Sequence, residues 1–198
     1  MKRLGVALLV LAMAACSRPA PTTPGAQDPQ NPSASTQASI PSATSGCNAS
    51  ASHDWSAVGS QYYMVEAEAH GPTCREAVAT MRIKAHDGQT VLFERSYPVA
   101  EVPLAFNPTS DQTGFRSDLE EWTTNVADTP TANWLPAWPA GADHPPFFRP
   151  SVSRATYESF RGMQGPIFCY PDGAESNACV AMNGDHATFL GSRTPERE

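Results

Sequence analysis

The sequence lacks the short signatures by which most catalytic and metal sites are recognised. It contains no Cys-x-x-Cys pair, no His-x-His or His-Glu-x-x-His spacing, and no Gly-x-Ser-x-Gly turn. Basic residues are scarce, with 13 Lys and Arg against 20 Asp and Glu, and a nucleic-acid partner needs a basic surface. After residue 15, no apolar run approaches the roughly 20 residues that cross a bilayer. The sequence therefore predicts no cofactor, no metal, no nucleic-acid partner and no named reaction.

The first residues are typical of a secretory signal. Lys2 and Arg3 precede an apolar run over residues 4–13, and two alanines then lead to Cys16. Positive charge, apolar core and small residues in this order mark a segment that is removed on export. The apolar run is about half the length of a membrane span, so we do not expect a permanent helix there.

Ala14-Ala15-Cys16 resembles the lipobox of bacterial lipoproteins, in which a diacylglyceryl group joins the cysteine thiol and cleavage occurs just before it. The family usually has Leu three residues before the cysteine, where this chain has Met13. The resemblance implies a signal peptide over residues 1–15 and acyl chains such as palmitate on Cys16, while Ser17 suggests an outer-membrane protein that faces the periplasm. The alternative is ordinary secretion that leaves Cys16 as a stray thiol. Two or three acyl chains hold a protein stably, so Cys16 alone would make the membrane a partner.

Residues 16–46 have the composition of a tether. They are rich in Pro, Ser, Thr and Ala, and their one large apolar residue is Ile40. Such a segment buries too little surface to offset its ordering entropy, so we expect disorder and a reach of roughly 30 Å, or about 90 Å when stretched. Loss of Lys2 and Arg3 leaves 11 basic against 20 acidic residues, a net charge near −9. Residues 47–198 have the size of a single domain.

The four remaining cysteines predict disulfides. An even number in an exported chain favours bridges over free thiols, and zinc is disfavoured by the spacing. Three pairings are possible, and we favour Cys47–Cys74 together with Cys169–Cys179, since each pair flanks neighbouring elements.

Hydrophobic alternation predicts strands in both halves of the domain. Residues 63–68 and 77–85 alternate with period two, and residues 90–97 form a β-branched and aromatic run. Asp87-Gly88 between the last two segments indicates a hairpin, so the three segments are predicted to form a meander. A C-terminal hairpin is predicted from segments 166–170, 179–182 and 187–190, with Asn183-Gly184 as a turn.

Two short helices are predicted between these strands. Phe115, Leu119, Trp122 and Val126 recur at helical spacing, with a capping box at Ser117-x-x-Glu120. A second helix is expected over residues 154–161. Ser153 would be its N-cap, Gly162 its stop, and Tyr157 and Phe160 its inward face. The predicted fold is a small, disulfide-stabilised α+β domain with an antiparallel sheet and helices on one of its faces.

Residues 129–150 are the most unusual segment. Trp134, Trp138, Phe147 and Phe148 lie among six prolines without any regular period. Long irregular loops are often functional, and aromatic rings anchor partners or stack on sugars, which makes these four residues the candidate binding loop. The competing interpretation is that the rings cover the sheet as core, as large aromatics mostly do.

Other candidates are weaker. Four histidines adjoin an aspartate, but side chains of neighbouring residues on a strand point apart. These pairs are His53-Asp54, His86-Asp87, Asp143-His144 and Asp185-His186. Asp118, Glu120 and Glu121 are possible paired acids for glycoside cleavage, although they also suit a helix terminus.

Two classes of function stay open. The first is a non-catalytic, lipid-anchored envelope module that binds a protein or glycan. The second is a cell-wall hydrolase that uses carboxylates or a His/Asp metal site. The lack of catalytic signatures favours binding, and convergence of two His-Asp pairs in one concave site would favour the enzyme.

Overall fold

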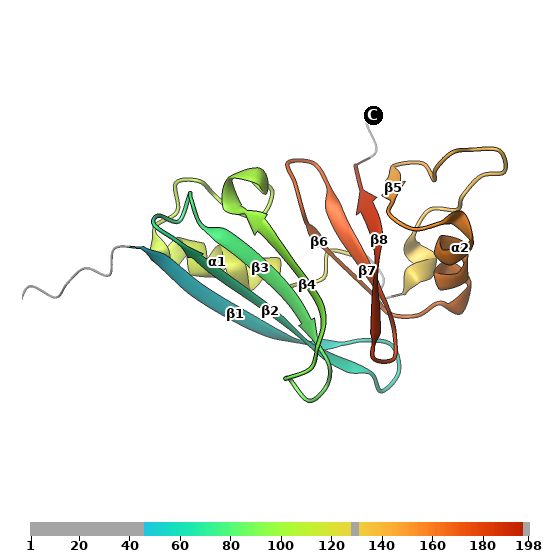
Figure 1. Cartoon of the computed structure of the whole chain (residues 1–198), viewed down its shortest axis with the longest axis horizontal. Coiled ribbons are helices and arrows are strands. Elements are labelled where there is room, and N and C mark those ends of the chain that lie inside the picture. The colour runs from blue at the N-terminus through green and yellow to red at the C-terminus, as the bar shows by residue number, and fades with distance from the viewer. Residues whose placement is uncertain (1–45, 128–130, 196–198) are drawn as a thin grey trace, which may run out of the picture. The chain divides into compact units, whose positions relative to one another are not determined.

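The computed structural model describes residues 46–127 and 131–195, which belong to one compact unit (Figure 1). The predicted signal peptide, Cys16 and the tether up to residue 45 lie outside the described residues. Two four-stranded antiparallel sheets and two α-helices make up this part of the chain. The predicted α+β class is confirmed, although the fold is largely β.

The first sheet has the order β1-β2-β3-β4, with every neighbouring pair antiparallel. Along β2 and β3, buried residues alternate with partly exposed ones, as the period-two pattern predicts. β1 is an addition to the predicted meander. Its sequence, CNASASHDWS, offers small and polar residues where a strand signal needs β-branched or aromatic ones. The strands are β1 (Cys47–Ser56), β2 (Tyr62–Gly71), β3 (Val78–Lys84) and β4 (Val91–Pro98).

The second sheet has the order β5-β8-β7-β6, and it contains the predicted C-terminal strands. The short β5 was not expected, because it ends the proline-rich segment and pairs with the end of β8. The meander and the C-terminal hairpin thus belong to separate sheets. The strands are β5 (Phe148–Pro150), β6 (Ile167–Pro171), β7 (Asn177–Asn183) and β8 (His186–Arg193).

The helix α1 (Gln112–Trp122) begins earlier than its predicted capping box. Its N-cap is Asp111, whose carboxylate accepts a hydrogen bond from the Gly114 N–H at 2.8 Å. Ser117 therefore lies in the middle of the helix, and the capping-box interpretation was wrong. Val126 lies beyond the helix end, where its N–H donates to the Cys169 carbonyl at 2.9 Å.

The helix α2 (Arg154–Met163) begins as predicted, with the Ser153 hydroxyl accepting from the Thr156 N–H. Tyr157 is buried and Phe160 packs partly against the same core. The predicted stop at Gly162 is wrong, because the helix runs one residue further. Gln164 ends it in the left-handed conformation, with φ of 53°.

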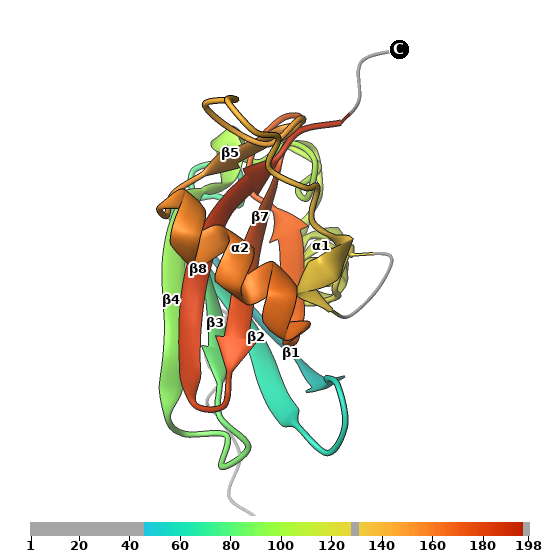
Figure 2. The same ribbon diagram turned by 90° about the vertical axis from the view of Figure 1, so that its right-hand side faces the viewer.

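Two cores divide the domain into layers (Figure 2). The first lies between the inner face of the first sheet and one face of the second sheet, with α1 contributing its apolar side. The second lies on the opposite face of the second sheet, under α2 and the proline-rich segment. The two helices thus belong to different cores, which lie on opposite faces of the second sheet. No helix among residues 46–127 and 131–195 is long and apolar enough to span a membrane.

Both predicted disulfides are present. Cys47–Cys74 joins the start of β1 to the connection between β2 and β3, across 27 residues. Cys169 and Cys179 lie directly opposite each other on β6 and β7. Bridges of this kind contribute on the order of 2–4 kcal/mol, largely by restricting the unfolded chain.

Candidate binding site

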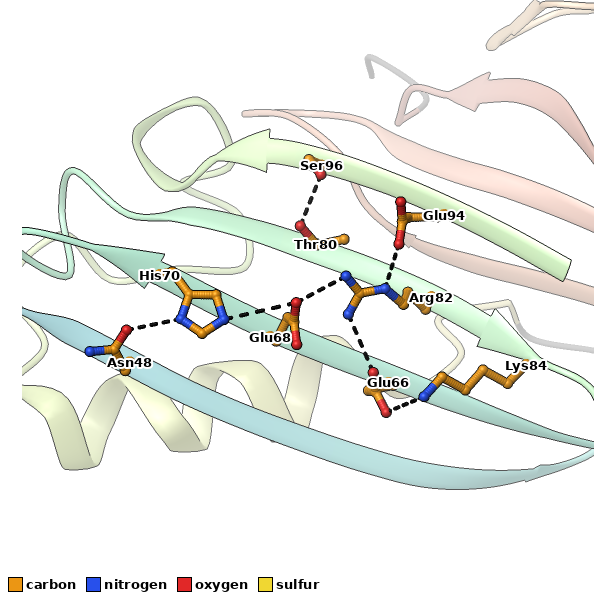
Figure 3. Close-up of polar contacts among 9 residues, drawn as sticks. All are labelled: Asn48, Glu66, Glu68, His70, Thr80, Arg82, Lys84, Glu94 and Ser96. Atoms are coloured by element: carbon orange, nitrogen blue, oxygen red, sulfur yellow. Dashed lines mark hydrogen bonds and ion pairs between the residues drawn. The ribbon is translucent and has the colours of Figure 1, made fainter. Parts of the chain in front are cut away.

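The outer face of the first sheet carries a polar network centred on Arg82 (Figure 3). Its guanidinium contacts three carboxylates, because the strand register places Glu66 and Glu94 on either side of it. The distances are 3.3 Å to Glu66, 2.9 Å to Glu68 and 2.5 Å to Glu94. Lys84 lies 2.6 Å from Glu66, so two cations face three carboxylates in this network. These carboxylates are therefore already paired within the sheet.

The pKa values of Glu68 and Arg82 are shifted toward their charged forms. The hydrogen bond from Arg82 lowers the pKa of Glu68, and hydrogen bonds to Glu68 and Glu94 raise the pKa of Arg82. Glu66, Glu68 and Glu120 line one shallow hollow of about 500 Å³. Glycoside cleavage needs a carboxyl group whose pKa is raised enough to keep its proton. The pKa of Glu68 is shifted in the opposite direction, so Glu68 does not suit the role of that acid.

The predicted acids on α1 do not form a catalytic pair. The Asp118 carboxylate accepts from the Asn107 N–H and the Ser110 hydroxyl, both at 3.1 Å, and so fixes the loop before the helix. Glu120 and Glu121 are exposed on the helix surface.

The His-Asp pairs do not assemble a metal centre. No three His, Cys, Asp or Glu residues in the described segments lie close enough to hold a metal ion. The Asp87 carboxylate accepts from Gln89 and Thr90 within its own turn, and these hydrogen bonds lower its pKa to about 2. The His144 ring contacts the neighbouring Pro145 carbonyl.

Two pairs nevertheless contribute one residue each to the same pocket. Asp54 and His86 line a hollow of about 410 Å³ at the end of the first sheet, together with Tyr62. The rings of Tyr62 and His86 meet edge to face, with centroids 6.3 Å apart. Near this end, the Tyr63 hydroxyl donates to the Gly184 carbonyl in the turn formed by Gly184 and Asp185. The partners His53 and Asp87 do not line the pocket.

The candidate binding loop is largely folded onto the second sheet. Phe148 is 1% exposed, and its ring lies 5.2 Å from the ring of Tyr157. Trp138 packs edge to face on Tyr157 at 5.6 Å, while its indole N–H donates to the Ala142 carbonyl. Trp134 is half-buried beneath the Arg193 guanidinium, which lies 4.3 Å from its ring. Residues 129 and 130 of the predicted segment lie outside the described residues.

Phe147 differs from the other three aromatic residues. It is 41% exposed and has φ of 54°, a conformation that is unusual for a side chain of this size. Its carbonyl accepts from the Thr194 N–H, so the backbone is held in place. Three of the four rings thus cover the sheet, and one offers an exposed apolar surface.

A groove opens where the second sheet extends beyond the first. The face of the second sheet that is turned toward the first sheet is less buried on β8 and β5 than on β6 and β7. On β6 and β7, Phe168 and Val180 are fully buried. Phe189 on β8 is partly buried, and Arg149 on β5 is exposed. This uncovered part forms a groove of about 450 Å³, bordered by Arg95 of β4. We call it the seam groove. Nine described residues line it: Arg95, Arg149, Pro150, Ser151, Glu175, Ser176, Phe189, Ser192 and Thr194.

Two arginines give the seam groove its charge. The Arg95 guanidinium lies 4.4 Å from the Phe189 ring centroid and 5.6 Å from that of Tyr97. Arg149 lies opposite Ser192 in the register of β5 and β8. Neither arginine has a carboxylate within ion-pair distance among the described residues. Stacking on a ring leaves the edge N–H groups of a guanidinium available to an acceptor.

Hydroxyl groups give the groove a second property. Ser176 and Ser192 both donate their hydroxyl protons to Asp172, at 2.6 and 2.5 Å. Their oxygens therefore face the groove as acceptors, since the donor of each hydroxyl is already used. The seam groove thus offers cationic donors and neutral acceptors beside an aromatic ring.

Sequence reasoning did not identify the seam groove. Arg95 and Arg149 lie 54 residues apart in different sheets. One signal was present: Arg95 occupies an inward position of a strand, between Phe93 and Tyr97, where an apolar residue is expected.

Comparison with protein-family models, with curated proteins and with solved structures finds no match for this chain.

Proposed function

We propose that this protein is a lipid-anchored module of the cell envelope that binds a partner without catalysis. Its anchor would be the acyl chains on Cys16, and residues 16–46 would give it reach from the outer membrane into the periplasm. The partner is an envelope protein or glycan. A net charge near −9 after removal of the signal disfavours nucleic acid.

One observation carries this proposal. Arg95 and Arg149 line an open groove and lack an ion-pair partner among the described residues, although acidic groups outnumber basic ones in the chain. An inward-pointing charge on an edge strand also protects a sheet against aggregation, and this alone would explain Arg95. It does not explain Arg149, which comes from the other sheet. The two arginines together favour a binding site.

The test is a pull-down from cross-linked cells with the full-length lipoprotein as bait. An Arg95→Gln/Arg149→Gln variant removes the groove charges, and Arg75→Gln/Arg116→Gln removes the same charge from two exposed positions elsewhere. A Phe147→Ala variant tests the exposed part of the aromatic loop. We expect wild type, the control and Phe147→Ala to retain one partner that the groove variant loses. Equal recovery of the partner by all four proteins would contradict binding at the groove. Loss of the partner with Phe147→Ala alone would place the binding site on the aromatic loop.

A cell-wall hydrolase is the second candidate, and it is supported by Asp54 and His86 in one pocket. Incubation of isolated cell wall with the wild type and an Asp54→Asn variant tests it. Release of soluble fragments by the wild type, lost in Asp54→Asn, would establish the enzyme. We expect no release by either protein.

A further inference from the structure

We propose that the seam groove binds an extended acidic peptide segment of an envelope protein, as an additional strand along β4. This inference rests on the proposed function and names the ligand of the same site. Three features carry it: an open strand edge, cations that lie beside that edge, and acceptors that face the groove.

The edge of β4 is open along its backbone. Val99 donates its N–H to the Ala77 carbonyl, and hydrogen-bonded pairs alternate along an antiparallel ladder. Arg95 therefore bonds to β3, whereas Glu94 and Ser96 direct their N–H and C=O groups outward. β4 pairs only with β3 within residues 46–127 and 131–195.

The equivalent edge of the second sheet is covered. Asn125 accepts from the Cys169 N–H and donates to the Ile167 carbonyl, and Val126 donates to the Cys169 carbonyl. These contacts satisfy β6 along its outer side. β4 thus differs from β6 in offering unused backbone groups to another chain.

The groove accommodates the strand that such pairing would add. A strand beside β4 would continue the first sheet over the uncovered part of β8 and β5. Its inward side chains would then meet Phe189, Arg149 and Ser192. A segment in this place would bury the face of the second sheet that the first sheet leaves open.

Charge selects which peptide fits. Arg95 points inward from β4, so a purely apolar strand would bury a cation without a partner, which is unfavourable. A carboxylate at the facing position pairs with Arg95 or Arg149, while the Ser176 and Ser192 oxygens accept from hydroxyl side chains at inward positions of the peptide. Glu175 is the one carboxylate among the described lining residues, and Asp172 lies behind Ser176 and Ser192, so the selectivity depends on the positions of the two arginines and not on an excess of positive charge. Arg95 thus disfavours pairing with an apolar strand and favours pairing with a strand that carries a carboxylate.

The test measures binding of labelled nonapeptides to the full-length lipoprotein. The first probe alternates Thr and Val with a central Asp. The second replaces Asp with Asn, and the third keeps Asp but carries N-methyl groups on alternate backbone nitrogens. We expect the second and third probes to bind about tenfold more weakly or worse, because one loses a charge-assisted hydrogen bond and the other loses strand pairing. Arg95→Gln/Arg149→Gln should lose the preference for Asp, and Arg75→Gln/Arg116→Gln should keep it.

Hydrogen exchange gives an independent measurement on the wild type. The amides of Glu94 and Ser96 should gain protection in the presence of the Asp probe. Equal binding of the N-methylated probe, or no gain at these two amides, would overturn strand addition. Equal binding of the Asn probe would overturn charge selection, and no binding of any probe would overturn the inference. Tighter binding of a cell-wall stem peptide with D-residues, or full competition by acetate, would overturn the assigned ligand class, while the pull-down result would still decide the proposed function.

Discussion

The paired hydroxyls of Tyr97 and Tyr170 give the sharpest test of the packing between the sheets. The two oxygens lie 2.9 Å apart in the first core, where Tyr97 is 8% exposed and Tyr170 is fully buried. Replacing one tyrosine by phenylalanine leaves the other hydroxyl buried without this partner, at a cost of about 1–3 kcal/mol. Replacing both removes the polar pair while keeping the rings, and the change is then close to neutral.

The prediction is therefore strong non-additivity. We expect Tyr97→Phe and Tyr170→Phe each to lower the free energy of unfolding by about 1–2 kcal/mol. The double variant should lose no more than either single variant, so the coupling is about 1 kcal/mol or more. Urea unfolding of the four proteins, with disulfides intact, measures these differences. Additive losses would refute the reasoning, because they would mean that each hydroxyl acts independently of the other.

Three further predictions concern titration and local structure. Burial raises the pKa of Tyr157, Tyr97 and Tyr170, so the folded state holds these protons more tightly than the unfolded state. Their contribution to the free energy of unfolding is therefore complete below pH 10 and should fall as the pH rises above 10. Thermal unfolding between pH 8 and 11 measures this change. Unchanged stability over that range would contradict it. The Asp87 carboxyl should titrate by NMR near pH 2, since hydrogen bonds within its turn favour the anion, and a midpoint at the ordinary value would contradict the turn geometry. Ser153→Ala should lower the free energy of unfolding by about 1 kcal/mol through loss of the α2 cap, whereas Ser151→Ala should leave it nearly unchanged.

The parts of the fold that the sequence predicted are those with strong local signals. β2 and β3 alternate cleanly, the turn at Asp87-Gly88 joins β3 to β4, and the Ser153 cap starts α2. Each signal depends on neighbouring residues only. The two disulfides were also predictable, because their cysteines flank elements that pair or adjoin in the chain.

The parts that failed depend on tertiary contacts. β1 is rich in Ala and Ser, and its pairing with β2 supplies what its own residues do not indicate. Asp111 is the N-cap of α1, whereas Ser117-x-x-Glu120, which has the residues of a capping box, lies inside the helix. The aromatic segment illustrates a competition between two interpretations. The structure places Phe148 in the core and leaves Phe147 exposed, although the two are neighbours in the sequence.

The seam groove shows why a site assembled from two sheets is difficult to predict. Arg95 is an exception to the inward pattern of its strand, but its role depends on Arg149 and on the sheet that extends past β4. Neither the register between β5 and β8 nor the position of the second sheet can be inferred from local patterns.

The most direct test of the binding function is the affinity of the purified protein without its acyl chains, residues 16–198, for isolated envelopes that lack their own copy of it. Sedimentation with wild type, Arg95→Gln/Arg149→Gln and Arg75→Gln/Arg116→Gln compares proteins that cannot bind through the anchor and, for the variants, proteins of the same charge. We predict that the groove variant binds at least tenfold more weakly than both others. Equal binding by the two variants would show that the seam groove is not the binding site.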